Sequence, residues 1–351
     1  MIQDVLRTLI EGRDLEEAEA TRAVEWVLSG EASPAQIAAF ATAMRMKGET
    51  VTEIAAAARC LRRRCDPVDG LPGVLLDTCG TGGGASKTFN VSTVAAVVVA
   101  ACGVPVAKHG LRAVTSRTGS ADLVEALGVR IDASRATVSR CLREVGIAFL
   151  YAPAFHVALL NAGVVRQELG IRTMFDLLAP LANPAGATHQ LLGVHSPRYL
   201  RTLAEVLSRL GARRAWVLHG AGGMDEVSPL GPTQVVSVRQ GVLIESTVVP
   251  SDFGVEPTTA EALVGGDPAT NAEITRSVLA GEPSGRRTAV VLNAAAALVV
   301  AEVTTDLREA AEMAQRAIDS GAARRTLARW VDVSNENTDA AAPRGPGGES
   351  A

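Results

Sequence analysis

The stretch that decides the fold covers residues 77–93 and reads DTCGTGGGASKTFNVST. A short apolar run, residues 74–78, leads into it, and an apolar segment of helical length, residues 94–102, follows it. This order predicts a strand, a glycine-rich loop and the first turn of a helix. Glycines let a backbone approach an anion closely, and the free amides at the start of a helix favour phosphate or pyrophosphate. The segment therefore indicates an anion site, with an ordinary glycine turn as the alternative.

Two familiar phosphate-binding loops can be compared with this segment. The P-loop places a Lys-Ser/Thr pair directly after its last glycine, but no glycine precedes Lys87. The dinucleotide fingerprint G-x-G-x-x-G tolerates alanine at its last position, so Gly80, Gly82 and Ala85 fit it by spacing alone. The acidic residue that this fingerprint requires after the next strand is replaced by Lys108. The dinucleotide interpretation stays open on spacing only.

The chain beyond residue 74 alternates short runs of Val, Ile and Leu with amphipathic segments. The expected strands are residues 74–78, 104–107, 129–131, 147–150 and 215–218, and the expected helices are 94–102, 121–127, 138–145 and 200–210. Residues 235–238 and 242–249 predict a hairpin with a glycine turn, and helices resume from residue 260 to about residue 331. This alternation predicts an α/β fold with a mostly parallel central sheet covered by helices.

The first 70 residues predict a small helical domain. Ser33-Pro34 is a helix start, and Thr50 to Glu53 form a capping box before the apolar run of residues 54–61. We expect part of residues 155–190 to pack on this domain, and residues 71–334 to form the α/β domain. Residues 335–351 are rich in Asn, Pro and Gly without periodicity, which predicts a disordered tail.

Composition limits the classes of partner and compartment. The 351 residues are 47% hydrophobic with a formal net charge of −4, so no basic excess indicates nucleic acid or an anionic membrane. The longest apolar stretch, residues 91–106, is too short to span a bilayer, and the N-terminus lacks a secretory segment. Five cysteines without a C-x-x-C pair predict free thiols in a reducing compartment, hence the cytoplasm.

A second polar segment follows the expected strand at residues 104–107 and reads AKHGLRAVTSRTGSAD over residues 107–122. Strand ends of this kind face the ligand crevice in an open α/β sheet. The cations and hydroxyls that could bind a polyphosphate there are Lys108, Arg112, Arg117, Thr115, Ser116 and Ser120. The alternative is a solvated basic loop.

Two further segments carry charged side chains. Asp225-Glu226 follows the expected strand at residues 215–218 and a glycine run, and hard carboxylate oxygens suit Mg²⁺; the alternative is a surface pair. Arg166 lies on an otherwise apolar expected helix and could clamp a carboxylate in bidentate fashion; the alternative is a structural Arg–Glu pair.

These four segments, in this order, resemble the anthranilate phosphoribosyltransferases over residues 1 to about 331. The family patterns are approximately G-T-G-G-D-G-x-x-T-F-N-x-S-T, K-H-G-N-R-x-x-S-S-x-x-G-S-A-D, V-R-x-x-L-G-x-R-T-x-F-N-x-L-G-P-L-x-N-P and D-E. The resemblance implies a helical domain hinged to an α/β domain, usually as a homodimer. It also implies transfer of ribose 5-phosphate from phosphoribosyl pyrophosphate (PRPP) to the amine of anthranilate, with release of pyrophosphate. Such an enzyme mainly positions its substrates and stabilises charge, so no dedicated nucleophile is expected.

The resemblance also assigns residues by position. The expected substrate-binding residues are Gly80, Gly83, Gly84, Thr88, Asn90, Val91, Ser92, Thr93, Lys108, His109, Gly110, Leu111, Arg112, Ala113, Thr115, Ser116, Ser120 and Arg166. Lys108 and Arg112 are expected to stabilise charge, and Arg166 to receive the aromatic acid. Ser92, Asp225 and Glu226 are expected to hold Mg²⁺.

Several positions depart from the family patterns. Leu111 replaces an asparagine that contacts the aromatic acceptor, and an apolar side chain cannot supply that hydrogen bond. Gly84-Ala85 replaces Asp-Gly, while Asp176 and Ala179 replace Asn and Gly. These changes leave a different aromatic acid open as the acceptor. A nucleic-acid-binding relative and a nucleoside phosphorylase are the other hypotheses; the negative net charge argues against the first, and the missing Lys-His-Ser run against the second.

Overall fold

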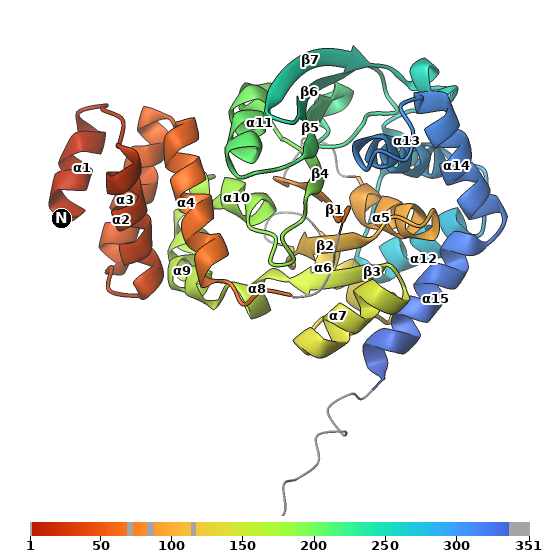
Figure 1. The fold of residues 1–351 in the computed structure, drawn as a ribbon, viewed down its shortest axis with the longest axis horizontal. Coiled ribbons are helices and arrows are strands. Elements are labelled where there is room, and N and C mark those ends of the chain that lie inside the picture. Colours follow the sequence, from red (N-terminus) through yellow and green to blue (C-terminus); the bar gives the residue numbers. More distant parts are fainter. Residues whose placement is uncertain (1, 69–72, 83–87, 114–116, 337–351) are drawn as a thin grey trace, which may run out of the picture.

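The structure, a computed structural model, describes residues 2–68, 73–82, 88–113 and 117–336. Figure 1 shows a bundle of helices on one side of the molecule and a larger part in which helices surround a sheet. This arrangement confirms the fold class predicted from the sequence.

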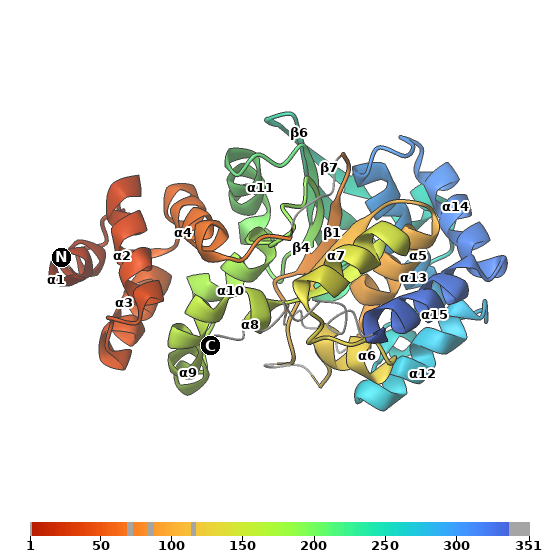
Figure 2. The same ribbon diagram turned by 60° about the horizontal axis from the view of Figure 1, so that its bottom comes forward.

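The helical bundle is built from two parts of the chain. Its helices are α1 (Ile2–Ile10), α2 (Glu17–Ser29), α3 (Pro34–Lys47), α4 (Val51–Arg64), α9 (Leu160–Leu169) and α10 (Met174–Leu178). The two predicted helix starts are confirmed, because Ser33 and Thr50 each accept a bond from a backbone amide of the first turn. Helix α9 contacts α2 and α3, and α10 contacts α3 and α4. Figure 2 shows α9 and α10 beside the N-terminal helices from a second direction.

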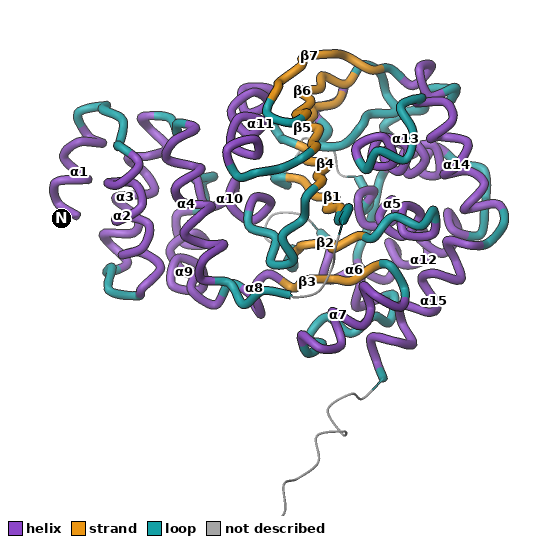
Figure 3. The backbone as a smooth tube through the Cα atoms, viewed as in Figure 1, coloured by secondary structure: helices purple, strands orange, loops and turns teal. Residues whose placement is uncertain are grey.

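In the part of the chain that the structure describes, the sheet has seven strands in the order β3-β2-β1-β4-β5-β6-β7. They are β1 (Leu76–Gly80), β2 (Val106–Gly110), β3 (Ile147–Tyr151), β4 (His189–Gly193), β5 (Arg214–Gly220), β6 (Thr233–Arg239) and β7 (Val242–Val248). The first five are parallel, and β6 and β7 form the predicted antiparallel hairpin. Figure 3 shows these strands as one continuous layer between helices.

Two strand predictions need correction. The strand expected at residues 129–131 is wrong, because these residues form a turn between α6 (Ser120–Ala126) and α7 (Arg135–Glu144). Val129 and Ile131 are apolar because they fill the core beneath that turn. The central strand β4 was not predicted, since HQLLG is short and has neither alternation nor a strong turn signal before it.

Each face of the sheet packs on its own core. On one face lie α5 (Val91–Ala101) and α13 (Gly285–Val300), which contact each other and β1, β2, β4 and β5. On the other lies α11 (Leu200–Arg209), together with the bundle. Consecutive β5 residues Val217 and Leu218 belong to different cores, as strand alternation requires. One core is therefore shared between the sheet and the bundle.

The remaining helices lie around these layers. Helices α14 (Leu307–Asp319) and α15 (Ala322–Asn335) pack on α5, α12 (Pro268–Leu279) contacts α6, and α8 (Ala152–Phe155) follows β3. Helix α15 extends through Asn335, and residues 337–351 of the expected tail lie outside the described residues. The division at residues 70 and 334 stays a prediction. None of the described helices is long and apolar enough to cross a membrane.

Asn293 ties the chain after Glu226 to α13, and this tie gives a stability prediction. Its amide oxygen accepts a bond from the Val227 backbone N–H (2.9 Å), and its nitrogen donates to the Val227 carbonyl (3.0 Å). Asn293→Leu leaves both buried backbone groups unpaired and should lower the free energy of unfolding by about 2 kcal/mol or more. Guanidinium denaturation measures this. Thr288→Val on the same helix is the control, with a change within about 0.5 kcal/mol. Equal midpoints for the two variants would contradict the prediction.

Candidate active site

Four of the parallel strands end in glycine at the same edge of the sheet. These glycines are Gly80 on β1, Gly110 on β2, Gly193 on β4 and Gly220 on β5. A Cβ on Gly193 would lie 1.6 Å from the backbone oxygen of Asp225, and one on Gly80 would lie 2.3 Å from its carboxylate. The loops therefore fold back onto the strand ends so closely that no side chain fits between them.

The two carboxylates of the loop after β5 lie at this edge. Oδ2 of Asp225 accepts a bond from the Gly82 amide of the glycine loop at 3.0 Å, whereas Oε2 of Glu226 is buried without a partner among the described residues. Burial raises the pKa of both carboxyls, and the neighbouring Asp225 raises that of Glu226 further. Two buried, adjacent acids of this kind need a cation to stay ionised.

Lys108 supplies one buried positive charge at the same place. Its side chain is only 2% exposed, and Nζ donates to the Thr78 carbonyl (2.6 Å) and to Oγ of Ser92 (3.3 Å) in the first turn of α5. Burial lowers the pKa of Lys108, while the nearby Asp77 and Glu226 oppose that shift. The structure thus joins the first, second and third sequence segments around one ammonium group.

The donor set at this edge of the sheet fits Mg²⁺. It offers the carboxylates of Asp225 and Glu226 and the Ser92 hydroxyl, all hard oxygen ligands, and one carboxylate oxygen lacks a partner among the described residues. The part of the chain that the structure describes contains no group of three or more His, Cys, Asp or Glu side chains that could hold a metal alone. Magnesium often takes one or two carboxylates and completes its shell with water and phosphate, so this sparse set is sufficient.

The start of α5 connects the two anion loops. Asn90 precedes the helix, and its Nδ2 donates to the Thr118 carbonyl at 3.1 Å, while its Oδ1 accepts from Asn271 at 3.0 Å. The buried Thr93 hydroxyl has no partner among the described residues. Thr88 forms an isolated bridge with Val264. The side chain of Val91 is fully buried and contributes to the core, so only its backbone can face a ligand.

The loop after β2 is held by an acid that the sequence reasoning did not single out. Oδ2 of Asp122 accepts bonds from the amides of Ala113 and Gly119, both at 2.9 Å. Oδ1 of Asp122 accepts from Arg112, which also pairs with Glu125 at 2.8 Å. The Arg112 side chain is 45% exposed, so solvent screens its ion pairs and they contribute little to stability. The motif G-S-A-D could have predicted this role of Asp122. Its acid stands three residues after the glycine that caps α6, which is the position of the acid in a capping box.

A second group of residues lies where β2 faces the bundle. Nδ1–H of His109 donates to the Ala179 carbonyl at 2.9 Å, which leaves Nε2 as a buried acceptor without a partner among the described residues. Burial, together with the His156 ring 5.1 Å away between centroids, lowers the pKa of His109 to about 3. His109 is therefore neutral. Arg166 on α9 pairs with Asp176 at 2.8 Å.

Two other residues, Asp77 and Thr81, form hydrogen bonds that hold the strand ends and the glycine loop in place. Asp77 is fully buried; it accepts from Nδ2 of Asn183 (2.8 Å) and from the His109 amide (3.3 Å), and burial raises its pKa to about 6. Thr81 in the glycine loop bonds with Nδ1 of His195 at 2.9 Å and accepts from the His195 amide at 3.0 Å. Neither role has a local sign in the sequence, because the partners stand more than 30 residues away.

The remaining expected residues are distributed as follows. Ser120 begins α6, and its hydroxyl donates to the Leu111 carbonyl at 3.4 Å; Leu111 itself is half-buried. Four expected substrate-binding residues lie outside the described residues, and they are Gly83, Gly84, Thr115 and Ser116. The structure thus brings three of the four sequence segments together around Lys108. Arg166 of the fourth pairs with Asp176, and His156, ahead of it in the chain, lies beside His109.

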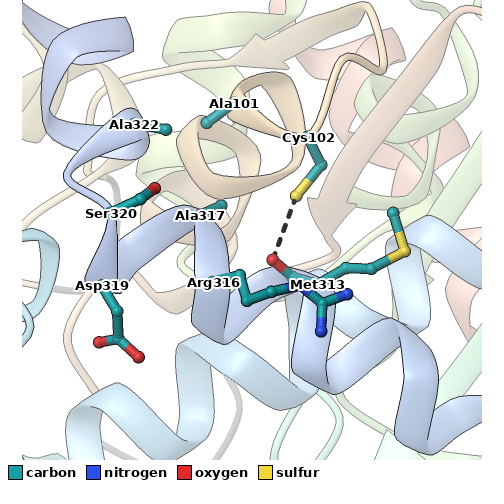
Figure 4. A pocket seen from close by; sticks show the side chains of 8 residues that line it. All are labelled: Ala101, Cys102, Met313, Arg316, Ala317, Asp319, Ser320 and Ala322. Atoms are coloured by element: carbon teal, nitrogen blue, oxygen red, sulfur yellow. Dashed lines mark hydrogen bonds between the residues drawn. The ribbon is translucent and has the colours of Figure 1, made fainter.

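A separate hollow lies at the other end of α5. Figure 4 shows its lining, which comes from the end of α5, from α14 and from the start of α15 and includes Cys102, Met313 and Arg316. The Cys102 thiol contacts the Met313 carbonyl at 3.8 Å. An 11-residue helix is about 16 Å long, so this hollow is separated from the Ser92 end of α5 and does not belong to the candidate site.

Comparison with known proteins agrees with this geometry. The profile described as "Glycosyl transferase family, a/b domain" matches residues 72–324, and the helical bundle profile of the same family matches residues 3–65. The anthranilate phosphoribosyltransferase of Symbiobacterium thermophilum is 51% identical over 331 residues, which cover 94% of this chain and 97% of that protein. The enzyme of Anaeromyxobacter dehalogenans is 52% identical over 331 residues, covering 94% and 98%.

Solved structures give the same result. The crystal structure of anthranilate phosphoribosyltransferase from Thermus thermophilus superposes with a TM-score of 0.90 at 43% identity, covering 95% of this chain and 100% of that one. The Saccharomyces cerevisiae enzyme in complex with PRPP and Mg superposes with a TM-score of 0.87 at 29% identity, covering 95% and 97%. On fold, site geometry and sequence, this chain belongs to the anthranilate phosphoribosyltransferase family.

Proposed function

We propose that this protein transfers ribose 5-phosphate from PRPP to the amine of anthranilate, releasing pyrophosphate, as a step of tryptophan biosynthesis. The observation that carries the proposal is the convergence of three strand-end loops on Lys108, Asp225 and Glu226. Relatives about half identical in sequence are named for this activity. Yeast structures of the family contain PRPP with Mg and, separately, 4-fluoroanthranilate.

The donor side of the site is suited to a polyphosphate. The amides and glycines of residues 80–82 and the start of α5 can face phosphate oxygens, with Lys108 and Arg112 as cations. Bound Mg²⁺, held by Ser92, Asp225 and Glu226, would neutralise the pyrophosphate leaving group. Since the ribose carbon gains positive character as pyrophosphate departs, these residues act by placing and balancing charge.

The acceptor side is suited to an aromatic amine. Nε2 of neutral His109 has no partner in the described part of the chain and can accept a hydrogen bond from an amine N–H, and Arg166 can meet a carboxylate. Leu111 lies on the same loop and offers no polar group. This last feature supports a second candidate, the same transfer to a different, less polar or substituted, aromatic acid. A nucleic-acid-binding role is disfavoured by the net charge of −4 and by the buried acidic pair.

We further propose a cytoplasmic homodimer. All five cysteines are free, in line with a reducing compartment. Several large apolar side chains are exposed on the bundle side, among them Ile10 (77%), Met46 (83%) and Val164 (63%). They come from α1, α3 and α9, and α3 contacts both of the others. Exposed apolar side chains on adjoining helices are typical of a surface that another subunit covers.

The first test is turnover. The wild type should release pyrophosphate only when PRPP, an aromatic amine and Mg²⁺ are all present. Glu226→Gln removes one carboxylate charge from the metal site and should lower kcat/KM for PRPP at least about tenfold, a loss that even outer-shell changes cause. Glu245→Gln on the exposed strand β7 is the matched control and should leave kcat/KM unchanged. Absence of turnover with every aminobenzoate, or full activity in a chelator, would reject the proposal.

The second test concerns the acceptor. Leu111→Asn restores a hydrogen-bonding side chain and should lower KM for anthranilate at least about fivefold, since a paired polar contact contributes about 1–3 kcal/mol. Leu111→Met, which keeps an apolar side chain of similar volume, should change KM little. Steady-state kinetics with anthranilate and a panel of substituted aminobenzoates makes the measurement. An unchanged or higher KM for anthranilate in the asparagine variant would mean that Leu111 does not set acceptor choice.

The third test concerns assembly. Light scattering coupled to gel filtration should give about twice the mass of one chain. Val164→Asp places a charge in the proposed apolar contact and should shift the protein to a monomer. Val242→Asp, at a similarly exposed site on β7 (60%), is the control and should remain a dimer. A wild type that is monomeric at micromolar concentration would refute the dimer.

A further inference from the structure

Arg166 already has a carboxylate partner within the protein. Its Nη2 donates to Oδ1 of Asp176 at 2.8 Å, and the two side chains are 23% and 25% exposed. Oδ2 of Asp176 accepts from the Thr173 amide at 2.8 Å, as the cap of α10. Both oxygens of Asp176 are therefore engaged, one by the helix start and the other by the guanidinium. The side chain is fixed beside Arg166 rather than free to swing away.

The pair still leaves donors on Arg166. Asp176 uses only one nitrogen, and Nε of Arg166 is buried without a partner among the described residues. A guanidinium has five N–H donors, so it can bind a second carboxylate while keeping the first. The local charge is lower than that of an unpaired arginine, however, because Asp176 offsets the positive charge that an incoming anion would meet.

The pair lies next to the acceptor side of the proposed site. Helix α10 leads directly into the turn at Ala179, whose carbonyl binds His109 at the end of β2. The charge of Asp176 also acts on His195, which holds Thr81 of the glycine loop. Asp176 thus pairs with the helix that carries Arg166 and acts electrostatically on the histidine that binds the glycine loop.

We propose that Asp176 is a specificity-determining residue: by neutralising Arg166, it reduces the preference of the enzyme for an acceptor that carries a carboxylate. This inference rests on the proposed function, in which Arg166 faces the aromatic acid. The carboxylate of anthranilate must bind within a few ångströms of a fixed carboxylate, and that repulsion offsets part of its attraction to the guanidinium. An acceptor without a carboxylate does not experience it.

The test compares two acceptors in one variant. Asp176→Asn removes the charge and keeps an oxygen that can cap Thr173 and an amide that is nearly the same size. We expect KM for anthranilate to fall about tenfold, with kcat unchanged and KM for PRPP unchanged. For the methyl ester of anthranilate, which lacks the negative charge, KM should stay the same. Asp176→Glu keeps the charge and should retain the ratio of KM values for acid and ester seen in the wild type.

The outcomes separate the inference from the function on which it depends. If the wild type turns over no aromatic amine, the proposed function fails. If the wild type is active but Asp176→Asn leaves the acid-to-ester ratio unchanged, or raises KM for anthranilate, the inference is overturned. A purely structural role would change KM for PRPP and for both acceptors together, and would lower the melting temperature. Arg166→Gln should abolish the effect of Asp176→Asn on the ratio, because the repulsion matters only when the guanidinium draws the carboxylate there.

Discussion

The buried ammonium of Lys108 is the group on which the rest of the site depends. Burial favours the neutral form of a lysine, and the same burial favours the neutral forms of Asp77 and Glu226, so each charge would be unstable alone. The acids oppose the shift of the lysine, and the lysine opposes the shifts of the acids. The lysine therefore helps to keep the two acids ionised, and they do the same for the lysine. A divalent cation would offset the excess of buried acids, which Lys108 alone offsets only in part.

The second constraint is space. Glycines at the ends of β1, β4 and β5 allow the Asp225 loop to lie directly on the strand ends, where any Cβ would collide with its backbone or carboxylate. This close approach brings Asp225 within 3.0 Å of the Gly82 amide. A loop held farther out would leave the carboxylates in solvent, with ordinary ionisation and little influence on a bound phosphate. The burial that shifts the carboxylate pKa values therefore depends on the close approach that the glycines allow.

The sequence predicted the loops well and their supports poorly. Residues 77–93 and 107–122 could be assigned because glycines, cations and hydroxyls cluster locally after apolar runs. The pairings of Thr81 with His195 and of Asp77 with Asn183 join residues more than 100 positions apart, and no local pattern marks them. The strand predicted at residues 129–131 was wrong because the local pattern was ambiguous. A short apolar run that fills a core looks the same in a loop as in a strand.

The helical bundle and the α/β part of the molecule share an apolar core and side-chain hydrogen bonds, in addition to their connection along the chain. Bundle residues lie in the same core cluster as Leu192 of β4. Polar contacts follow the same route, because Arg45 of α3 donates to the Tyr199 hydroxyl at 2.9 Å, and the Tyr199 ring lies 5.3 Å from that of His195, the partner of the glycine loop. These contacts connect the bundle, through Tyr199 and His195, to Thr81 of the glycine loop. Arg166 also lies on a bundle helix, so the bundle carries one of the proposed site residues and contacts the part of the chain that holds the glycine loop.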